Sequence, residues 1–191
     1  IKREFKRQSS ASYRVFIYGH YQDPHHPYAP PLSYLEEYTD DIEISAAEAL
    51  DIAIRISHDV IMDSDRFASG ALDLTDTEIA ALGAMYDATI TYVDSCIGDL
   101  ADWIRSRDDN TIFIITGDHG ELLGERGMLG HRVITHDAVS HVPMVIAGPT
   151  EAIDYDGTLL QPIDVVKTLL SEVEAHTTTL QGIDLRTDVR S

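Results

Sequence analysis

The sequence predicts an α/β domain of three layers, in which helices cover both faces of a mostly parallel central sheet. Short apolar runs rich in β-branched and aromatic residues alternate along the chain with longer segments of helical periodicity. Strands that are apolar on both faces are typical of parallel sheets, because helices cover both sides of such sheets. The alternation of strands with helices is typical of the α/β class.

Three segments are expected to be strands of this sheet. Residues 111–116, TIFIIT, are almost wholly apolar, and we expect them to form the central strand. Residues 13–19 and residues 142–147 are also apolar and β-rich, and should flank it. The first of these runs directly into QDPHHPYAPP, residues 22–31, whose prolines exclude both helix and ladder pairing. A rigid loop that carries histidines therefore follows a buried strand.

The clearest helix in the sequence covers residues 75–106. Thr75 and Glu78 have the spacing of a capping box at its start. Apolar residues then recur at intervals of three and four, which places them on one helix face: Ile79, Leu82, Tyr86, Ile90, Val93, Ile97, Leu100 and Ile104. A last helix is expected to begin near Pro162, whereas residues 34–70 contain helical patterns with poorly defined ends.

The chain is strongly acidic, with 33 acidic residues against 14 basic ones and a formal net charge of -19. Such a charge repels phosphate backbones and argues against nucleic acid as a partner. The acidic residues are spread along the chain and lysine is scarce, which favours a halophilic protein over an ordinary acidic one, because concentrated salt screens self-repulsion. This composition in turn favours a cytoplasmic location.

Other global features are less informative. No apolar run is long enough to span a membrane, and the single cysteine, Cys96, excludes an intramolecular disulfide. Residues 1–12 are polar and basic, and are expected to be a linker or a frayed segment. The chain begins with Ile1 and not with methionine, so an upstream portion is expected.

Asp118 and His119 are the first candidates for chemistry. They directly follow TIFIIT and are flanked by glycines. In α/β sheets, ligands bind beyond the carboxyl ends of the strands. A carboxylate oxygen and an imidazole nitrogen together suit a divalent cation. The alternative is a polar turn in which Asp118 caps the next segment.

Several segments, in consistent order, resemble the sulfatase family within the alkaline phosphatase superfamily. They are HYQDPHHPYAPP, YDATITYVD, TIFIITGDHGELLGERGMLGH, HVPMVIAGP and QPIDVVKTLLSEV with the later GIDL. The resemblance covers residues 13 to 187, far more of the chain than a single motif would. It implies that residues 13–191 are the C-terminal part of a sulfatase-like catalytic domain, which hydrolyses a small-molecule or glycan sulfate ester.

The resemblance also implies roles for four residues. Asp118 and His119 match the family's metal-binding pair, for which calcium is the favoured cation and magnesium, manganese or zinc are alternatives. His25 matches a histidine that contacts the sulfate and assists the leaving group, and His131 falls where relatives carry lysine or histidine against the substrate oxyanion. These roles are chemically sensible, because a sulfate ester needs a protonated leaving oxygen and neutralised equatorial oxygens.

The remaining histidines and nearby charged residues are expected to have lesser roles. His20 lies near the site, Glu121 and Arg126 line the pocket, and His141 is structural. Four further histidines are expected to be solvated or to make only local hydrogen bonds: His26, His58, His136 and His176.

The family's nucleophile is expected outside this chain. It is a formylglycine made from the Cys or Ser of a Cys/Ser-x-Pro-x-Arg motif, and no such motif occurs here; Cys96 is followed by Ile97 and Gly98. Two further aspartate ligands of the metal are missing as well. We therefore expect a partner, the N-terminal half of the same domain, and little turnover by this chain alone.

Two alternatives remain open. The same metal frame serves phosphodiesterases, phosphonate hydrolases and phosphoglycerol transferases of the superfamily. In an interpretation of another class, the chain is a non-catalytic binding domain or an inactive remnant, and Asp118 and His119 are turn residues. A structural calcium module is disfavoured, because no Asp-x-Asp-x-Asp-Gly loop occurs.

Overall fold

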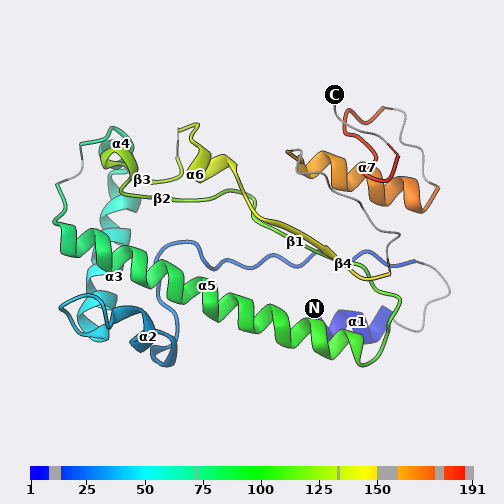
Figure 1. Ribbon diagram of the computed structural model, residues 1–191, viewed down its shortest axis with the longest axis horizontal. Helices are drawn as coiled ribbons and strands as arrows, with labels where there is room; N and C mark the ends of the chain where they lie inside the picture. Colours follow the sequence, from blue (N-terminus) through cyan, green and yellow to red (C-terminus); the bar gives the residue numbers. More distant parts are fainter. Residues whose placement is uncertain (9–13, 72, 133, 150–158, 175–178, 188–191) are drawn as a thin grey trace. The chain divides into compact units, whose positions relative to one another are not determined.

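The computed structural model describes residues 1–8, 14–71, 73–132, 134–149, 159–174 and 179–187 (Figure 1). The chain divides into two compact units. The larger one comprises Ile1–Asp109 and Phe113–Ile146, and the smaller one comprises Asn110–Ile112 and Ala147–Ser191. The four residues with expected site roles all belong to the larger unit. In the parts of the chain that the structure describes, no helix is long and apolar enough to cross a membrane.

Helices make up most of the larger unit. Its helical elements are α1 (Lys2–Gln8), η1 (Leu32–Tyr34), α2 (Glu36–Thr39), α3 (Ala46–Met62), α4 (Ser64–Ala68), α5 (Asp76–Arg105), η2 (Glu125–Gly127) and α6 (Asp137–Ser140). Its strands are β1 (Phe113–Thr116), β2 (Leu122–Leu123), β3 (Leu129–Gly130) and β4 (Met144–Ala147), whose last residue is grouped with the smaller unit. The smaller unit contains α7 (Pro162–Glu172).

The predicted long helix is confirmed as α5. The Thr75 hydroxyl accepts a hydrogen bond from the Glu78 amide (3.2 Å), and the Glu78 carboxylate accepts one from the Thr75 amide (2.9 Å). This capping box satisfies amides that the first helical turn leaves unpaired. Of the predicted apolar stripe, Leu82 and Ile104 are buried, whereas Ile90 is 43% exposed.

The core of the larger unit lies where α3 packs against α5 (Figure 1). Ala49 and Ala53 of α3 are fully buried, and their small side chains allow the two helices to approach closely. Leu82 and Met85 of α5 and Leu35, which precedes α2, complete this cluster and are each at most 1% exposed. The same cluster includes Tyr28 and Leu129, and so extends to the segments that carry the expected site residues.

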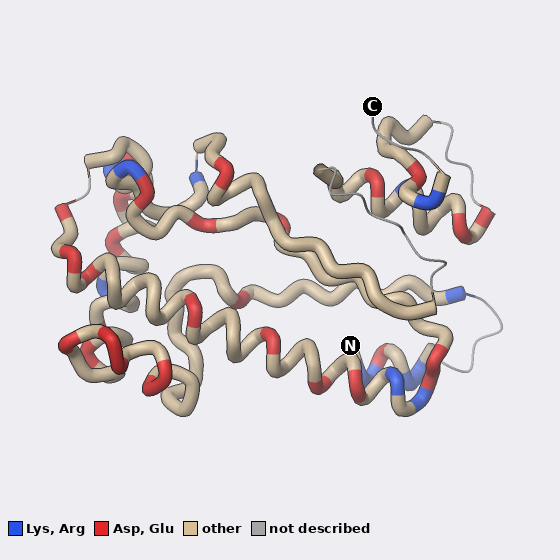
Figure 2. The backbone as a smooth tube through the Cα atoms, in the orientation of Figure 1, with Lys and Arg blue, Asp and Glu red and all other residues tan. Residues whose placement is uncertain are grey.

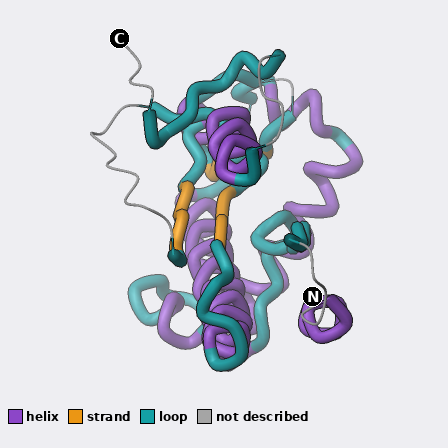
Figure 3. The backbone as a smooth tube through the Cα atoms, turned by 90° about the vertical axis from the view of Figure 1, so that its right-hand side faces the viewer, coloured by secondary structure: helices purple, strands orange, loops and turns teal. Residues whose placement is uncertain are grey.

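The predicted mostly parallel, three-layer sheet is not found among the described residues. β1 pairs with β4, and β2 pairs antiparallel with β3, so the strands form two separate two-stranded sheets. β1 and β4 lie side by side in Figures 1 and 3, as expected for residues 111–116 and 142–147. The α/β character is retained, but β1 is half-buried and not covered on both faces.

The prediction of a strand over 13–19 is wrong for the described residues 14–19, which have no strand structure; residue 13 lies outside the described residues. The side chains of Phe16 and Tyr18 are 79% and 73% exposed. An apolar segment becomes a strand only when a neighbouring strand accepts its backbone hydrogen bonds. In the described parts of the chain, β1 has β4 as its hydrogen-bonded neighbour, and 14–19 pairs with neither.

Residues 2–8 form α1, where the sequence suggested a linker or frayed segment; residues 9–12 lie outside the described residues. The Phe5 ring packs edge-on against Trp103, with 5.7 Å between ring centroids. Figure 2 shows that basic residues gather on α1 and near the end of α5, whereas acidic residues are distributed along α5 and over the other helices of this unit.

In the smaller unit, α7 begins at Pro162 as predicted. The buried carboxylate of Asp164 accepts hydrogen bonds from the amides of Gln161 (2.8 Å) and Ile183 (2.9 Å). The first of these bonds caps the helix, and the second fixes the segment after it.

Candidate active site

Asp118 and His119 emerge from the end of β1, as the sequence predicted. The Asp118 carboxylate accepts a hydrogen bond from the His119 amide (3.0 Å), and its side chain is 70% exposed. The His119 Nδ1–H donates to the carbonyl oxygen of Gly120 (2.9 Å), because a carbonyl can only accept. In this tautomer Nε2 of His119 is the nitrogen that carries the lone pair, and it lies 3.9 Å from Asp118 Oδ1.

His25 reaches the same region from the proline-rich loop 22–31. Its amide donates to the carbonyl of Gln22 (3.0 Å), which forms a turn. Its ring Nδ1–H donates to the carbonyl of His26 (2.7 Å), so Nε2 is again the nitrogen left free. The prolines restrict the backbone of this loop and favour a fixed presentation of the ring.

His131 is positioned by the pairing of β2 with β3. In this antiparallel register Leu122 is opposite Gly130, which brings the preceding Glu121 beside the following His131. The His131 Nδ1–H donates to Glu121 Oε1 (3.0 Å), and only 3% of the Glu121 side chain is exposed. The buried carboxylate thus orients the imidazole, and leaves its Nε2 free.

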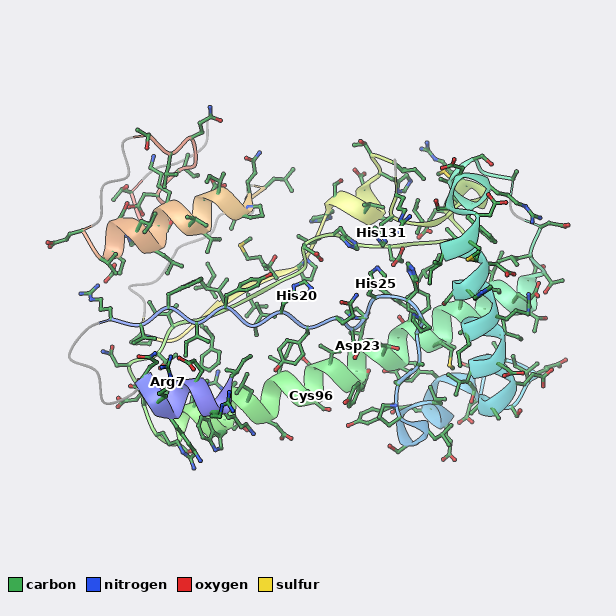
Figure 4. The ribbon with its side chains drawn as sticks, turned by 180° about the vertical axis from the view of Figure 1, so that it is seen from behind. Arg7, His20, Asp23, His25, Cys96 and His131 are labelled. Atoms are coloured by element: carbon green, nitrogen blue, oxygen red, sulfur yellow. The ribbon has the colours of Figure 1, made fainter. Side chains whose placement is uncertain are left out.

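The histidine rings converge into one cluster. His119 stacks on His131, with ring centroids 3.9 Å apart and an interplanar angle of 23°. His25 lies 5.2 Å from His131 and 6.3 Å from His119, measured between centroids. Figure 4 shows His25 and His131 close together, one from the loop and one from the end of β3. The structure therefore brings His25, His119 and His131 together beside Asp118.

His26 also belongs to this cluster, and its expected role as a solvated or locally bonded residue is wrong. Its ring centroid lies 4.0 Å from that of His25 and 5.9 Å from that of His131. The Nδ1 atom is buried and has no hydrogen-bond partner among the described residues. Burial, followed by repulsion from His25 and His131, lowers the pKa of His26 from 6.5 to about 4, so the ring is neutral at physiological pH.

Glu121 lines the site as expected and is its most buried charged side chain among the described residues. Burial and the neighbouring Glu121 carboxylate both raise the pKa of the Tyr28 phenol, to which Glu121 is hydrogen-bonded. The same two causes raise the pKa of Tyr86. Sequence reasoning could have found the pairing of Glu121 with His131 from their ten-residue separation across a Gly-containing turn, but not the burial.

The other candidates that the structure describes lie outside the cluster. His20 is exposed and bonds the Tyr18 hydroxyl (3.1 Å), and Arg126 is exposed in the turn between β2 and β3. His136 accepts a hydrogen bond from the Ala138 amide (3.1 Å) and caps α6. His58 and His141 are exposed, and His176 lies outside the described residues.

The residues at the end of β1 fit a divalent cation. The free Nε2 of His119 and the exposed carboxylate of Asp118 offer an imidazole nitrogen and an oxygen donor on adjacent residues. The neighbouring imidazole rings of His25, His26 and His131 have nitrogen atoms that can contact the oxygens of an anionic ligand. A candidate cation site and candidate proton donors, the two elements that ester hydrolysis requires, therefore lie close together.

Comparison with known proteins identifies the family of this chain. A family model described as Sulfatase matches residues 3–174. The choline-sulfatase of Rhizobium meliloti (strain 1021) is 30% identical over 151 residues, which are 76% of this chain and 29% of that protein. The uncharacterized sulfatase YidJ of Escherichia coli (strain K12) is 26% identical over 79% of this chain and 30% of its own length. The chain therefore belongs to the sulfatase family.

The matched relatives are much longer than this chain and differ in their described activities. The chain spans about 30% of the length of the two sulfatases. It is also 35% identical over 115 residues to the multifunctional alkaline phosphatase superfamily protein PehA of Trinickia caryophylli, which covers 57% of this chain and 22% of that protein. The similarities therefore define the family of this chain.

Proposed function

We propose that this chain contributes part of the active site of a metal-dependent hydrolase of small-molecule or glycan sulfate esters. One observation carries the proposal. His25, His119 and His131 come from separate segments, converge at the end of β1, and each has its Nδ1–H held by an acceptor. Three imidazoles with free Nε2 atoms beside a carboxylate suit a divalent cation and an anionic ester better than they suit a polar turn.

In this proposal His25 is the general acid. Its Nδ1–H bond to the His26 carbonyl fixes the ring, so that protonated Nε2 can donate to the leaving oxygen of the ester. His131, oriented by Glu121, contacts the sulfate oxygens. Asp118 and His119 hold the cation, with calcium proposed and magnesium, manganese or zinc as alternatives; when bound, it neutralises charge on those oxygens.

The rest of the active site is proposed to lie outside this chain. A formylglycine nucleophile needs a Cys/Ser-x-Pro-x-Arg motif, and no position in the sequence has it. The exposed Phe16 and Tyr18 and the half-buried β1 support the same idea, because further strands beside them would complete the sheet. The complete domain would then have the three-layer architecture with a mostly parallel sheet.

A second candidate is hydrolysis or transfer of a phosphate ester on the same frame. The similarity to the PehA protein, and a 38% identity over 66 residues to the phosphoethanolamine transferase EptA of Salmonella typhimurium (strain LT2), favour it. Histidines and a divalent cation can stabilise the charge on a sulfate ester or on a phosphate ester. The nucleophile, which the rest of the enzyme supplies, therefore decides which of the two esters is the substrate.

The test is sulfate release from an aryl sulfate by the full-length protein that contains this chain, with an aryl phosphate as the second substrate. Asp118→Ala should abolish turnover, and His25→Ala should reduce kcat about 100-fold or more. His58→Ala, an exposed histidine of α3, is the matched control and should leave turnover unchanged. Full activity of Asp118→Ala in the presence of a chelator would overturn the metal assignment and favour a non-catalytic role for these residues.

A further inference from the structure

The histidine cluster contains a group with the composition of a transition-metal site. One ring nitrogen each from His25, His26 and His131 lie within 4.8 Å of one another, and all three rings are half-buried. This group is distinct from the Asp118–His119 pair: it has three nitrogen donors and no oxygen donor. Imidazole nitrogens favour zinc, copper and nickel, whereas carboxylate and carbonyl oxygens favour calcium and magnesium.

We propose that His25, His26 and His131 bind a transition-metal ion of the zinc class as a three-histidine site. A tetrahedral Zn–N site with bonds of about 2.0–2.1 Å places its nitrogens about 3.4 Å apart. The three nitrogens would therefore close by about 1.4 Å or less from their present separations of up to 4.8 Å. Binding therefore requires the three rings to approach one another by this amount, and the fourth position is left for water or a ligand.

The partners of the outer nitrogens support this assignment. A histidine that binds a metal nearly always donates its other ring N–H to a carboxylate or a backbone carbonyl. His131 has a carboxylate in this position, Glu121 Oε1 at 3.0 Å, and His25 has a carbonyl, that of His26 at 2.7 Å. These two bonds fix the tautomers in which Nε2 is the free donor atom.

His26 supplies the third nitrogen donor. Its Nδ1 is buried without a hydrogen-bond partner among the described residues, which is a costly state for a polar atom. Two exposed histidines of the larger unit differ from it, because His20 bonds Tyr18 and His58 lies beside Asp59. The excess of negative charge on the chain also raises the local concentration of cations.

A metal in this site would occupy the nitrogens of His25 and His131 that ester hydrolysis is proposed to use. Zinc would then inhibit turnover, a consequence that rests on the proposed function. Metal binding itself does not rest on the proposed function, so a binding measurement tests the site independently of catalysis.

The experiment is a titration of the full-length protein that contains this chain with Co²⁺, whose visible absorption reports tetrahedral coordination, followed by displacement with Zn²⁺ and with Ca²⁺. We expect one Co²⁺ per chain, displaced by Zn²⁺ and not by Ca²⁺. His26→Gln should abolish the absorption band, and Glu121→Gln should weaken binding about 10–100-fold by removing the acceptor of the His131 ring. His20→Gln is the matched control and should bind like the unmodified chain.

Three results would overturn the proposal: no tetrahedral Co²⁺ band, a band that His26→Gln retains, or a band that Asp118→Ala removes. The last would place the ion at the end of β1 instead. Circular dichroism of each variant checks folding, and if His26→Gln does not fold, His131→Gln and Glu121→Gln decide the outcome. None of these measurements requires catalytic activity, so failure of the site and failure of the proposed hydrolysis are distinguishable.

Discussion

Replacing Gly120 by alanine should destabilise the larger unit, because the backbone of α6 leaves no room for a Cβ atom at this position. A Cβ atom on Gly120 would lie 2.0 Å from the carbonyl oxygen of Ala138 and 3.1 Å from its carbonyl carbon. Both are backbone atoms of α6 and cannot rotate away. The Gly120 amide also donates to the carbonyl of Val139 (2.7 Å), which holds the two segments together.

The magnitude can be worked out from these contacts. Ordinary contact begins near 3.4 Å, so the segments would have to separate by about 1.4 Å. Overpacking of this kind costs about 1–3 kcal/mol, and weakening the hydrogen bond from Gly120 to Val139 adds about 1 kcal/mol. The free energy of unfolding should therefore fall by about 2–4 kcal/mol, which lowers the Tm by roughly 5–15 °C for a chain of this size.

Gly83→Ala is the matched control. Gly83 lies inside α5, and apart from the backbone of that helix no atom lies within 4 Å of an added Cβ. Alanine is favoured over glycine inside a helix, so this variant should gain about 0.5–1 kcal/mol. Urea unfolding followed by circular dichroism measures both changes. A Gly120→Ala variant as stable as the unmodified chain would refute the close packing of α6 against the segment that carries His119.

Three further outcomes are expected. Thr75→Ala should cost about 1 kcal/mol in urea unfolding by removing the capping box, while Thr75→Ser should recover most of it; equal stabilities would contradict the role of the cap. The Tm should rise between 0.1 M and 3 M potassium chloride, because salt screens the net charge of -19, and a flat or falling Tm would remove the halophile interpretation. The pKa of His26 is about 4 in the folded chain against 6.5 for the ordinary residue. Between these two values the unfolded chain binds a proton at His26 that the folded chain does not. The free energy of unfolding should therefore have its full value above pH 6.5 and should fall as the pH drops from 6.5 towards 4. Urea unfolding at pH 7 and pH 5 measures this loss, which should be smaller for His26→Gln.

Helices α5 and α7 could be predicted because their signals are local. The capping residues Thr75 and Glu78 act within one helical turn, and Pro162 begins α7 at the position where proline is best tolerated. The sheet could not be predicted in the same way. Whether an apolar segment such as 14–19 becomes a strand depends on a partner strand, which a local pattern does not specify. The same limit explains why β1 is less buried than its composition suggests.

The candidate site was predictable in part. Its four expected residues follow from the strand-end position of Asp118 and His119 and from the family resemblance, and the structure brings these four side chains to one place. Their catalytic and metal-binding roles stay predictions. His26 was missed because its burial depends on distant packing: it adjoins Tyr28, which is buried against the helical core together with Leu129. The sequence feature that could have indicated a role for His26 is its position next to His25 between two prolines.

The orientations of the site's histidine rings depend on two kinds of contact, one between neighbouring residues and one between residues far apart in the sequence. His25 and His119 are each held by the carbonyl of the next residue, so their ring orientations are set within their own loops. His131 is held by Glu121, ten residues away, and this contact exists only in the register that places Leu122 opposite Gly130. A slip of one residue would turn the side chains of that strand to the other face and separate the buried carboxylate from its imidazole. The short β2–β3 pairing therefore controls whether His131 joins the other histidines, which makes it the structural element on which both the proposed hydrolysis and the three-histidine metal site depend.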